Sequence, residues 1–133
     1  MQIRVATEKD LETLSVDQHI SRKELENIIA LNRVYILEEK GIFAGWLRYN
    51  LFWDNTPFMN MLFVMDAYRG KGYGKALAEY WEEDMRKLGY KWVMTSTVSD
   101  EYAQHLYYKL GYQAAGGFTP PQDIYEIILT KVL

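Results

Sequence analysis

The chain has 133 residues, of which 49% are hydrophobic, 15% aromatic and 25% charged, and this composition predicts one folded domain over residues 1–133 rather than two domains or a disordered chain. There is no cysteine and there are two histidines, His19 and His105, which excludes a disulfide framework and a cysteine nucleophile and argues against any metal site. Fifteen Lys and Arg residues against 18 Asp and Glu residues give a formal net charge of −3, the wrong sign for binding nucleic acid through its phosphates.

Targeting features are also missing from the sequence. No apolar run reaches the roughly 20 residues that a membrane helix needs, and the start, Met1-Gln2-Ile3-Arg4, lacks the apolar core of a signal peptide. We therefore expect no membrane and no nucleic-acid partner, and a cytoplasmic location.

The first 30 residues predict a strand followed by two short helices. Residues 3–6 form a β-type run, and Thr7 with Asp10 has the spacing of a capping box that begins a helix. Ser21 begins a second helix in the same way, because apolar residues follow it at helical intervals up to about Asn32.

The next segment predicts the centre of a β-sheet. Residues 34–38 and 42–49 are rich in β-forming side chains, and Glu39-Lys40-Gly41 between them suits a tight hairpin. After a turn, the run 58–65 is apolar on both alternating faces except at Asn60, which is typical of a central strand covered on both sides.

A long amphipathic helix is predicted to follow this strand and to end at Gly89. The positions that we expect to be buried are Leu77, Tyr80, Trp81 and Leu88. Glu82 with Arg86, and Glu83 with Lys87, have the spacing of ion pairs on a solvated opposite face.

The last third of the chain alternates strand and helix. Residues 91–97 predict a strand, a short helix ends at Gly111, and two β segments at 112–116 and 124–130 flank a loop at 117–121. The apolar side of the short helix carries Ala103, Leu106, Tyr107 and Leu110. The whole pattern predicts an α/β fold with a mixed central β-sheet flanked by about four helices.

The segment Arg69-Gly70-Lys71-Gly72-Tyr73-Gly74-Lys75 lies between the predicted central strand and the long helix. Glycines let the backbone amides approach an anion, and the helix dipole and basic side chains attract it, so the segment predicts a pyrophosphate site. A Walker loop would need glycine at Arg69 and Ser or Thr at Ala76, and a dinucleotide fingerprint would need glycine at Lys75, so both are excluded.

Two blocks of sequence, in order, match motifs of a known family. The first is Leu62-x-Val64-x-Asp66-x-x-Arg69-x-x-Gly72-x-Gly74, which departs from the family's acetyl-coenzyme A motif only at Asp66, where the motif has proline. The second is Asp100-x-x-Ala103-x-x-Leu106-Tyr107-x-Lys109-Leu110-Gly111-Tyr112, with Asp100 in place of asparagine. The chain thus resembles the GCN5-related N-acetyltransferases (GNAT family). The resemblance implies a single domain with the acyl-CoA N-acyltransferase fold and acetyl-CoA as the acyl donor, without a metal.

The resemblance also implies a role for each matching residue. The backbone of Leu62, Phe63 and Val64 would bind the pantetheine arm, and an amide near Val64 would polarise the thioester carbonyl. Asp100 would make a further contact with the cofactor. The residues implied to hold the pyrophosphate are Arg69, Gly70, Lys71, Gly72, Tyr73, Gly74 and Lys75.

Tyr107 matches the tyrosine that stands near the cofactor sulfur and protonates the departing thiolate in many family members. The alternative is a tyrosine that only packs a helix, because Tyr102 and Tyr108 lie nearby. No general base is assigned, since Asn60 and Thr95 stand where many relatives have glutamate and neither can accept a proton. A water chain to a remote carboxylate is the remaining route, with Glu38, Asp54 and Glu126 as candidates.

The acceptor groove of the family usually lies near the third strand and the turn after it. The aromatic residues there are Trp46, Tyr49, Phe52 and Trp53, and they would suit an amine through cation–π contact. Sheet packing or a dimer contact is the alternative for them. We expect His19 and His105 to be structural or exposed.

The resemblance implies an N-acetyltransferase that transfers an acetyl group from acetyl-CoA to a primary amine of a small molecule or peptide, by direct attack in a ternary complex. Two alternatives stay open, a catalytically weak acyl-CoA-binding sensor or interaction module, and an acyltransferase that uses a longer acyl donor. Dimers are frequent in the family, so a homodimer is a further expectation.

Overall fold

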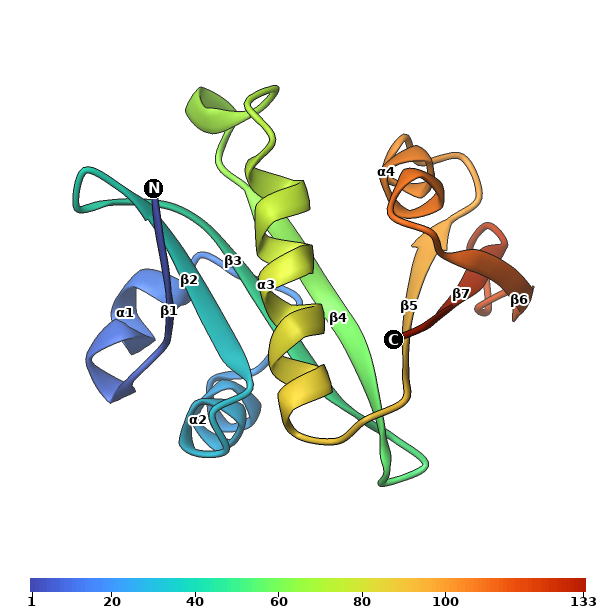
Figure 1. The fold of residues 1–133 in the computed structure, drawn as a ribbon, viewed down its shortest axis with the longest axis horizontal. Helices are drawn as coiled ribbons and strands as arrows, with labels where there is room; N and C mark the ends of the chain where they lie inside the picture. Colours follow the sequence, from blue (N-terminus) through green and yellow to red (C-terminus); the bar gives the residue numbers. More distant parts are fainter.

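The computed structural model describes all 133 residues, and its seven strands form one mixed sheet in the order β1-β2-β3-β4-β5-β7-β6 (Figure 1). The predicted central strand, β4, is the middle strand of this sheet. Its contact with β5 is parallel and every other pairing is antiparallel. The strands are β1 Gln2–Val5, β2 Val34–Glu39, β3 Ile42–Phe52, β4 Thr56–Val64, β5 Trp92–Val98, β6 Gln113–Phe118 and β7 Glu126–Val132.

Four α-helices and two short 3₁₀ turns connect the strands. The helices are α1 Leu11–Leu14, α2 Arg22–Ala30, α3 Tyr73–Lys87 and α4 Ala103–Lys109, and the 3₁₀ turns are η1 Glu8–Asp10 and η2 Asp66–Tyr68. No helix is long and apolar enough to cross a membrane. The α/β fold and the helix count expected from the sequence are therefore confirmed.

The helices cover opposite faces of the sheet, and the alternation of side chains along β2 shows this directly. Val34 and Ile36 pack in the cluster that α1 and α2 form on one face, whereas Tyr35 and Leu37 pack in the cluster of α3 and α4 on the other. Successive side chains of a strand point to opposite faces, so β2 is buried on both.

The local signals for helix starts and turns are confirmed. Thr7 and Asp10 form the predicted capping box, and the Ser21 hydroxyl accepts a hydrogen bond from the Glu24 amide at 3.2 Å. Lys40 and Gly41 have φ values of 52° and 79°, as the tight hairpin between β2 and β3 requires.

The buried face of α3 differs from the predicted one. Tyr80 and Leu88 are 43% and 62% exposed, whereas Met85 is fully buried and Glu82 is 2% exposed. Glu82 accepts hydrogen bonds from the Tyr112 hydroxyl and from Lys131 Nζ, both at 2.8 Å. The predicted Glu82–Arg86 and Glu83–Lys87 pairs are wrong, and Glu82 instead has distant partners, Tyr112 and Lys131, that helical spacing alone does not show. Arg86 pairs with Glu83 instead, at 3.1 Å.

Strand β4 is covered on both sides only in its first half, which corrects a second expectation. Thr56, Pro57 and Met59 are buried, Asn60 is exposed, and residues 61–64 are half-buried. Strand β6 also continues to Phe118, into the segment expected to be a loop. The partial exposure of β4 has a structural cause, which is the opening of the sheet beside it.

Candidate functional site

The sheet opens between its two parallel strands. Strands β4 and β5 are paired only at Phe58–Met94 and Met59–Thr95, and Figure 1 shows them diverging beyond this point. Asn60 is an extra residue of β4 at this position, because Arg48 is opposite Met61 while the next residue of β3 is opposite Met59. A bulge of this kind bends a strand and ends its pairing, so the rest of β4 has no partner on its β5 side.

The glycine segment lies at the end of the opened β4 and leads into α3. None of the six backbone amides from Gly70 to Lys75 donates a hydrogen bond to another protein group, and the first amide bonded in α3 is that of Ala76, to Gly72. Gly70 and Gly72 have φ values of 76° and 81°, a conformation that glycine adopts at little cost. Backbone amides without a partner at a helix N-terminus form an anion site.

The basic side chains of this segment have different surroundings. Arg69 is held by the protein, since its Nε donates to the Val64 carbonyl at 2.9 Å and its guanidinium lies 3.0 Å from an Asp66 oxygen. Lys71 lies over the Tyr68 ring at 5.7 Å. Neither Lys71 nor Lys75 pairs with a carboxylate, so their charges are available to an anion.

The Tyr73 hydroxyl donates a hydrogen bond to Glu39. This bond ties the first residue of α3 to the β2–β3 hairpin, which holds the start of the helix in place. Glu39 therefore lowers the freedom of the loop that carries the unpartnered amides.

A cavity of about 510 Å³ runs through the opening between β4 and β5. Tyr107 of α4 lines it together with Met59 and Thr95, and the Thr95 hydroxyl donates to the Met59 carbonyl at 2.9 Å. Burial raises the pKa of Tyr107 to about 12, against a smaller lowering by Thr95. The phenol therefore keeps its proton at neutral pH and can donate it.

A second cavity, of about 790 Å³, lies on the α1–α2 face of the sheet. It has aromatic walls, including Trp46 and Phe63, and shares lining residues with the first cavity. The shared residues are His19, Met61, Leu62 and Glu101. We call these four residues the junction of the two cavities.

The structure separates several residues that the sequence groups together. Of the aromatic residues expected at the acceptor groove, only Trp46 lines the second cavity. Tyr49 is buried on the other face beside Trp81, while the Phe52 and Trp53 rings contact each other at a tilt of 49° at the β3–β4 turn.

Among the candidate remote carboxylates, Glu126 lines the first cavity. Glu38 instead accepts a hydrogen bond from Arg4 at 2.9 Å, and Asp54 is exposed in the β3–β4 turn.

Two residues at the junction were not identified from the sequence. His19, expected to have no connection to the chemistry, lines both cavities, and so does Glu101. Asp100, the motif residue next to Glu101, is exposed and lines neither cavity. Glu101 follows a motif position directly, and that adjacency was the available signal.

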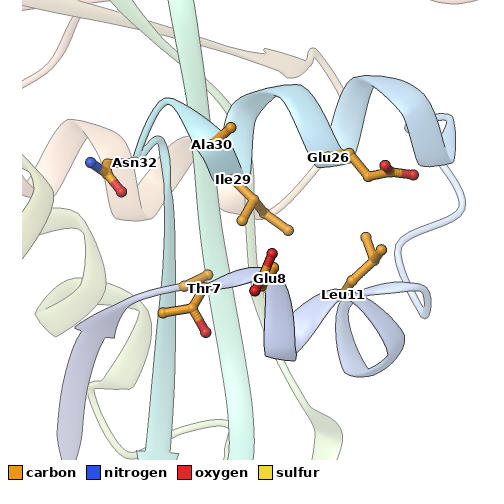
Figure 2. Close-up of a pocket in the computed structure, with 8 residues that line it drawn as sticks. Thr7, Glu8, Leu11, Glu26, Ile29, Ala30 and Asn32 are labelled. Atoms are coloured by element: carbon orange, nitrogen blue, oxygen red, sulfur yellow. The ribbon is translucent and has the colours of Figure 1, made fainter.

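A further cavity, of about 590 Å³, lies apart from these features, between the β1–η1 segment and α2. Figure 2 shows Thr7 and Glu8 on one side of it and Ile29 on the other. It includes no residue of the glycine segment or of the β4–β5 opening, so we assign it no part in the site.

A mixed sheet that opens between two parallel strands, beside an anion-binding helix start, defines the acyl-CoA N-acyltransferase fold. The model of the acetyltransferase (GNAT) family matches residues 5–112, and the chain belongs to that family. The expected enzyme class, an acetyl-CoA-dependent N-acetyltransferase, is confirmed by this membership.

Solved structures share the fold along nearly the whole chain. Ard1 from Thermoplasma volcanium has a TM-score of 0.85 at 15% identity, covering 99% of this chain and 97% of Ard1. A GNAT-family acetyltransferase from Bacillus cereus has a TM-score of 0.80 at 23% identity, covering 98% and 96%. The PaiA N-acetyltransferase from Thermoplasma acidophilum, in complex with coenzyme A, has a TM-score of 0.80 at 18% identity, covering 99% and 98%. No curated protein sequence matches the chain.

Proposed function

We propose that the protein transfers the acetyl group of acetyl-CoA to a primary amine of a small molecule or peptide, by direct attack in a ternary complex. The observation that carries the proposal is the run of six unpartnered amides from Gly70 to Lys75, placed beside the opening between β4 and β5. The PaiA structure, of similar fold, contains coenzyme A.

The residues of this chain fit the pyrophosphate and the thioester arm of acetyl-CoA. The loop amides, with Lys71 and Lys75, hold the two phosphates, and the free edge of Leu62, Phe63 and Val64 binds the pantetheine arm. Arg69 acts by holding the loop against β4, because its Nε is already bonded to Val64. Asp100 is exposed and contacts the outer part of the coenzyme.

Tyr107 acts as the general acid. Bound acetyl-CoA supplies an acetyl group activated as a thioester. Tyr107 gives its proton to the sulfur as the carbon–sulfur bond breaks and the bond between the amine nitrogen and the carbonyl carbon forms. The acceptor ammonium loses two protons in all, of which one restores Tyr107 and the other leaves to solvent through the junction.

Two alternatives make different predictions. A sensor or interaction module would bind acetyl-CoA and turn over no amine, and the absence of a glutamate at Asn60 or Thr95 is the observation in its favour. An acyltransferase for longer chains would use the same coenzyme-binding residues and differ only in the volume around the acyl group.

The test is thiol release from acetyl-CoA with polyamines, aminoglycosides, amino acids and short peptides as acceptors, beside calorimetric binding of acetyl-CoA alone. We expect binding, and turnover with at least one acceptor. Binding without turnover would support the sensor, and no binding would refute the proposed site. Replacing acetyl-CoA by propionyl-CoA and butyryl-CoA distinguishes the donor classes.

A further inference from the structure

Arg48 of β3 has a buried guanidinium, with its side chain 8% exposed. Its Nε donates to Asp17 Oδ2 at 2.7 Å, and the same oxygen accepts a hydrogen bond from Trp46 Nε1 at 3.0 Å. The other oxygen of Asp17 accepts from the His19 amide at 3.0 Å. Burial would raise the pKa of Asp17, but these partners lower it, so Asp17 is ionised and neutralises Arg48.

The two terminal nitrogens of Arg48 have no hydrogen-bond partner in the protein. These nitrogens are not fully buried, because Nε1 of Trp81 is the one fully buried side-chain nitrogen or oxygen that lacks a partner. They are open to the first cavity, which Arg48 lines. A guanidinium has five N–H donors, and those of Arg48 on these nitrogens are free. These donors face the cavity, where water or a ligand oxygen can accept hydrogen bonds from them.

Arg48 lines the same cavity as the acid, Tyr107. It is opposite Met61, one residue beyond the bulge at Asn60 where β4 leaves β5. Tyr107 lines the same cavity from α4, and the charge of Glu101 is close enough to contribute to the raised pKa of Tyr107. A ligand oxygen on Arg48 would therefore belong to a molecule in the same cavity as Tyr107.

The cavity thus contains both signs of charge. Glu101 and Glu126 line it with Arg48, so it offers carboxylates to an ammonium and a guanidinium to an oxygen of the same molecule. Because Asp17 already neutralises Arg48, a neutral carbonyl oxygen can bind there without adding a second buried negative charge.

Resting on the proposed function, we infer that the acceptor is an α-aminoacyl unit in amide linkage, an amino acid amide or the N-terminus of a peptide. The terminal nitrogens of Arg48 donate to its carbonyl oxygen, and Glu101 and Glu126 attract its ammonium. Polyamines and simple alkylamines have no oxygen for Arg48. A free amino acid would place a second carboxylate beside Asp17.

The test compares matched amines on the wild-type protein: glycinamide with methylamine, L-alaninamide with ethylamine, and L-phenylalaninamide with 2-phenylethylamine. The carboxamide also lowers the basicity of the amine, so kcat/KM is measured over a range of pH and expressed per unprotonated amine. Compared in this way, the amino acid amide is the weaker nucleophile of each pair, because its amine is less basic. We nevertheless expect it to react about 10- to 100-fold faster in the best pair, as a hydrogen bond to a charged group allows. Free glycine, alanine and phenylalanine should be poorer than their amides.

The variant Arg48→Lys retains a charge for Asp17 but removes the forked donors, and it should abolish the preference within each pair. Arg33→Lys is the matched control, since Arg33 lines neither cavity and bonds to Asn50, and it should retain the preference. Equal or better rates for the simple amines in the wild-type protein would overturn the inference even if Arg48→Lys does not fold. A preference that survives in folded Arg48→Lys would also overturn it. Turnover of a polyamine or an aminoglycoside but of none of these amides would overturn the inference and leave the proposed function standing, whereas turnover of no acceptor at all would refute the proposed function itself.

Discussion

Substitutions at Gly72 can separate two requirements of the glycine segment. One is that no negative charge lies beside the pyrophosphate, and the other is the left-handed backbone conformation that glycine adopts at little cost. It is the N-cap of α3 with φ of 81°, and a Cβ built on it meets no atom within 4 Å. Gly89, after the other end of the same helix, also has positive φ, 92°, and an equally open Cβ position. Substitution at either position therefore costs left-handed strain of about 1–2 kcal/mol and creates no clash.

The effect on acetyl-CoA binding should differ sharply between the two positions. A carboxylate roughly 6 Å from each of two phosphate charges, at an effective dielectric constant of about 40, costs about 3 kcal/mol in all. Gly72→Glu should therefore weaken acetyl-CoA binding about 100-fold. Gly89→Glu should leave the affinity unchanged at a similar loss of stability, and Gly72→Lys should pay the same strain while binding better than Gly72→Glu.

Calorimetric titration of acetyl-CoA and urea unfolding of each variant provide the two readouts. Equal affinity losses for Gly72→Glu and Gly72→Lys would mean that strain, not charge, controls the loop. Unchanged affinity in Gly72→Glu would show that the pyrophosphate binds elsewhere.

The other predictions concern the acid, a buried carboxylate and pH. Tyr107→Phe should lower turnover about 100-fold or more with unchanged acetyl-CoA affinity, and the wild-type pH–rate profile should show no loss from Tyr107 until pH approaches its pKa of about 12. Equal turnover rates of Tyr107→Phe and the wild-type protein at neutral pH would mean that Tyr107 only packs against its neighbours and is not the acid. Glu82→Gln should cost about 3 kcal/mol in urea unfolding because it weakens a buried ion pair, whereas Glu83→Gln, on the exposed side of α3, should cost less than about 1 kcal/mol. Similar costs would contradict the burial argument. Hydrogen bonds from Arg4 lower the pKa of Asp10, so its contribution to stability is complete above about pH 4 and is lost as pH falls further. Unfolding free energies that decline equally below pH 4 in Asp10→Asn and in the wild type would refute this.

Features with a local cause could be predicted from the sequence. The cap at Thr7 and the helix end at Gly89 depend on hydrogen bonds or backbone angles within a few residues. The middle position of β4 also followed from a pattern that is apolar on both faces except at Asn60. The unpartnered amides after Arg69 follow from the glycine spacing at a helix start.

Features that depend on distant partners could not be predicted in this way. Glu82 has the helical spacing of a surface residue, yet its partner Lys131 is 49 positions away. The bulge at Asn60 depends on the register with β3, which a single strand does not encode. Arg48 is a polar residue in an apolar strand, and its burial becomes understandable only once Asp17 is placed 31 positions earlier beside it.

The most direct test of the central claim is hydrogen–deuterium exchange at the amides of residues 70–75, followed by NMR in the free protein and with saturating acetyl-CoA or pantetheine. These amides donate to no protein group, so we predict fast exchange in the free protein and marked protection with acetyl-CoA. Pantetheine, which lacks the pyrophosphate, should give no protection. Unchanged exchange at residues 70–75 in protein saturated with acetyl-CoA would contradict the claim that this loop holds the pyrophosphate.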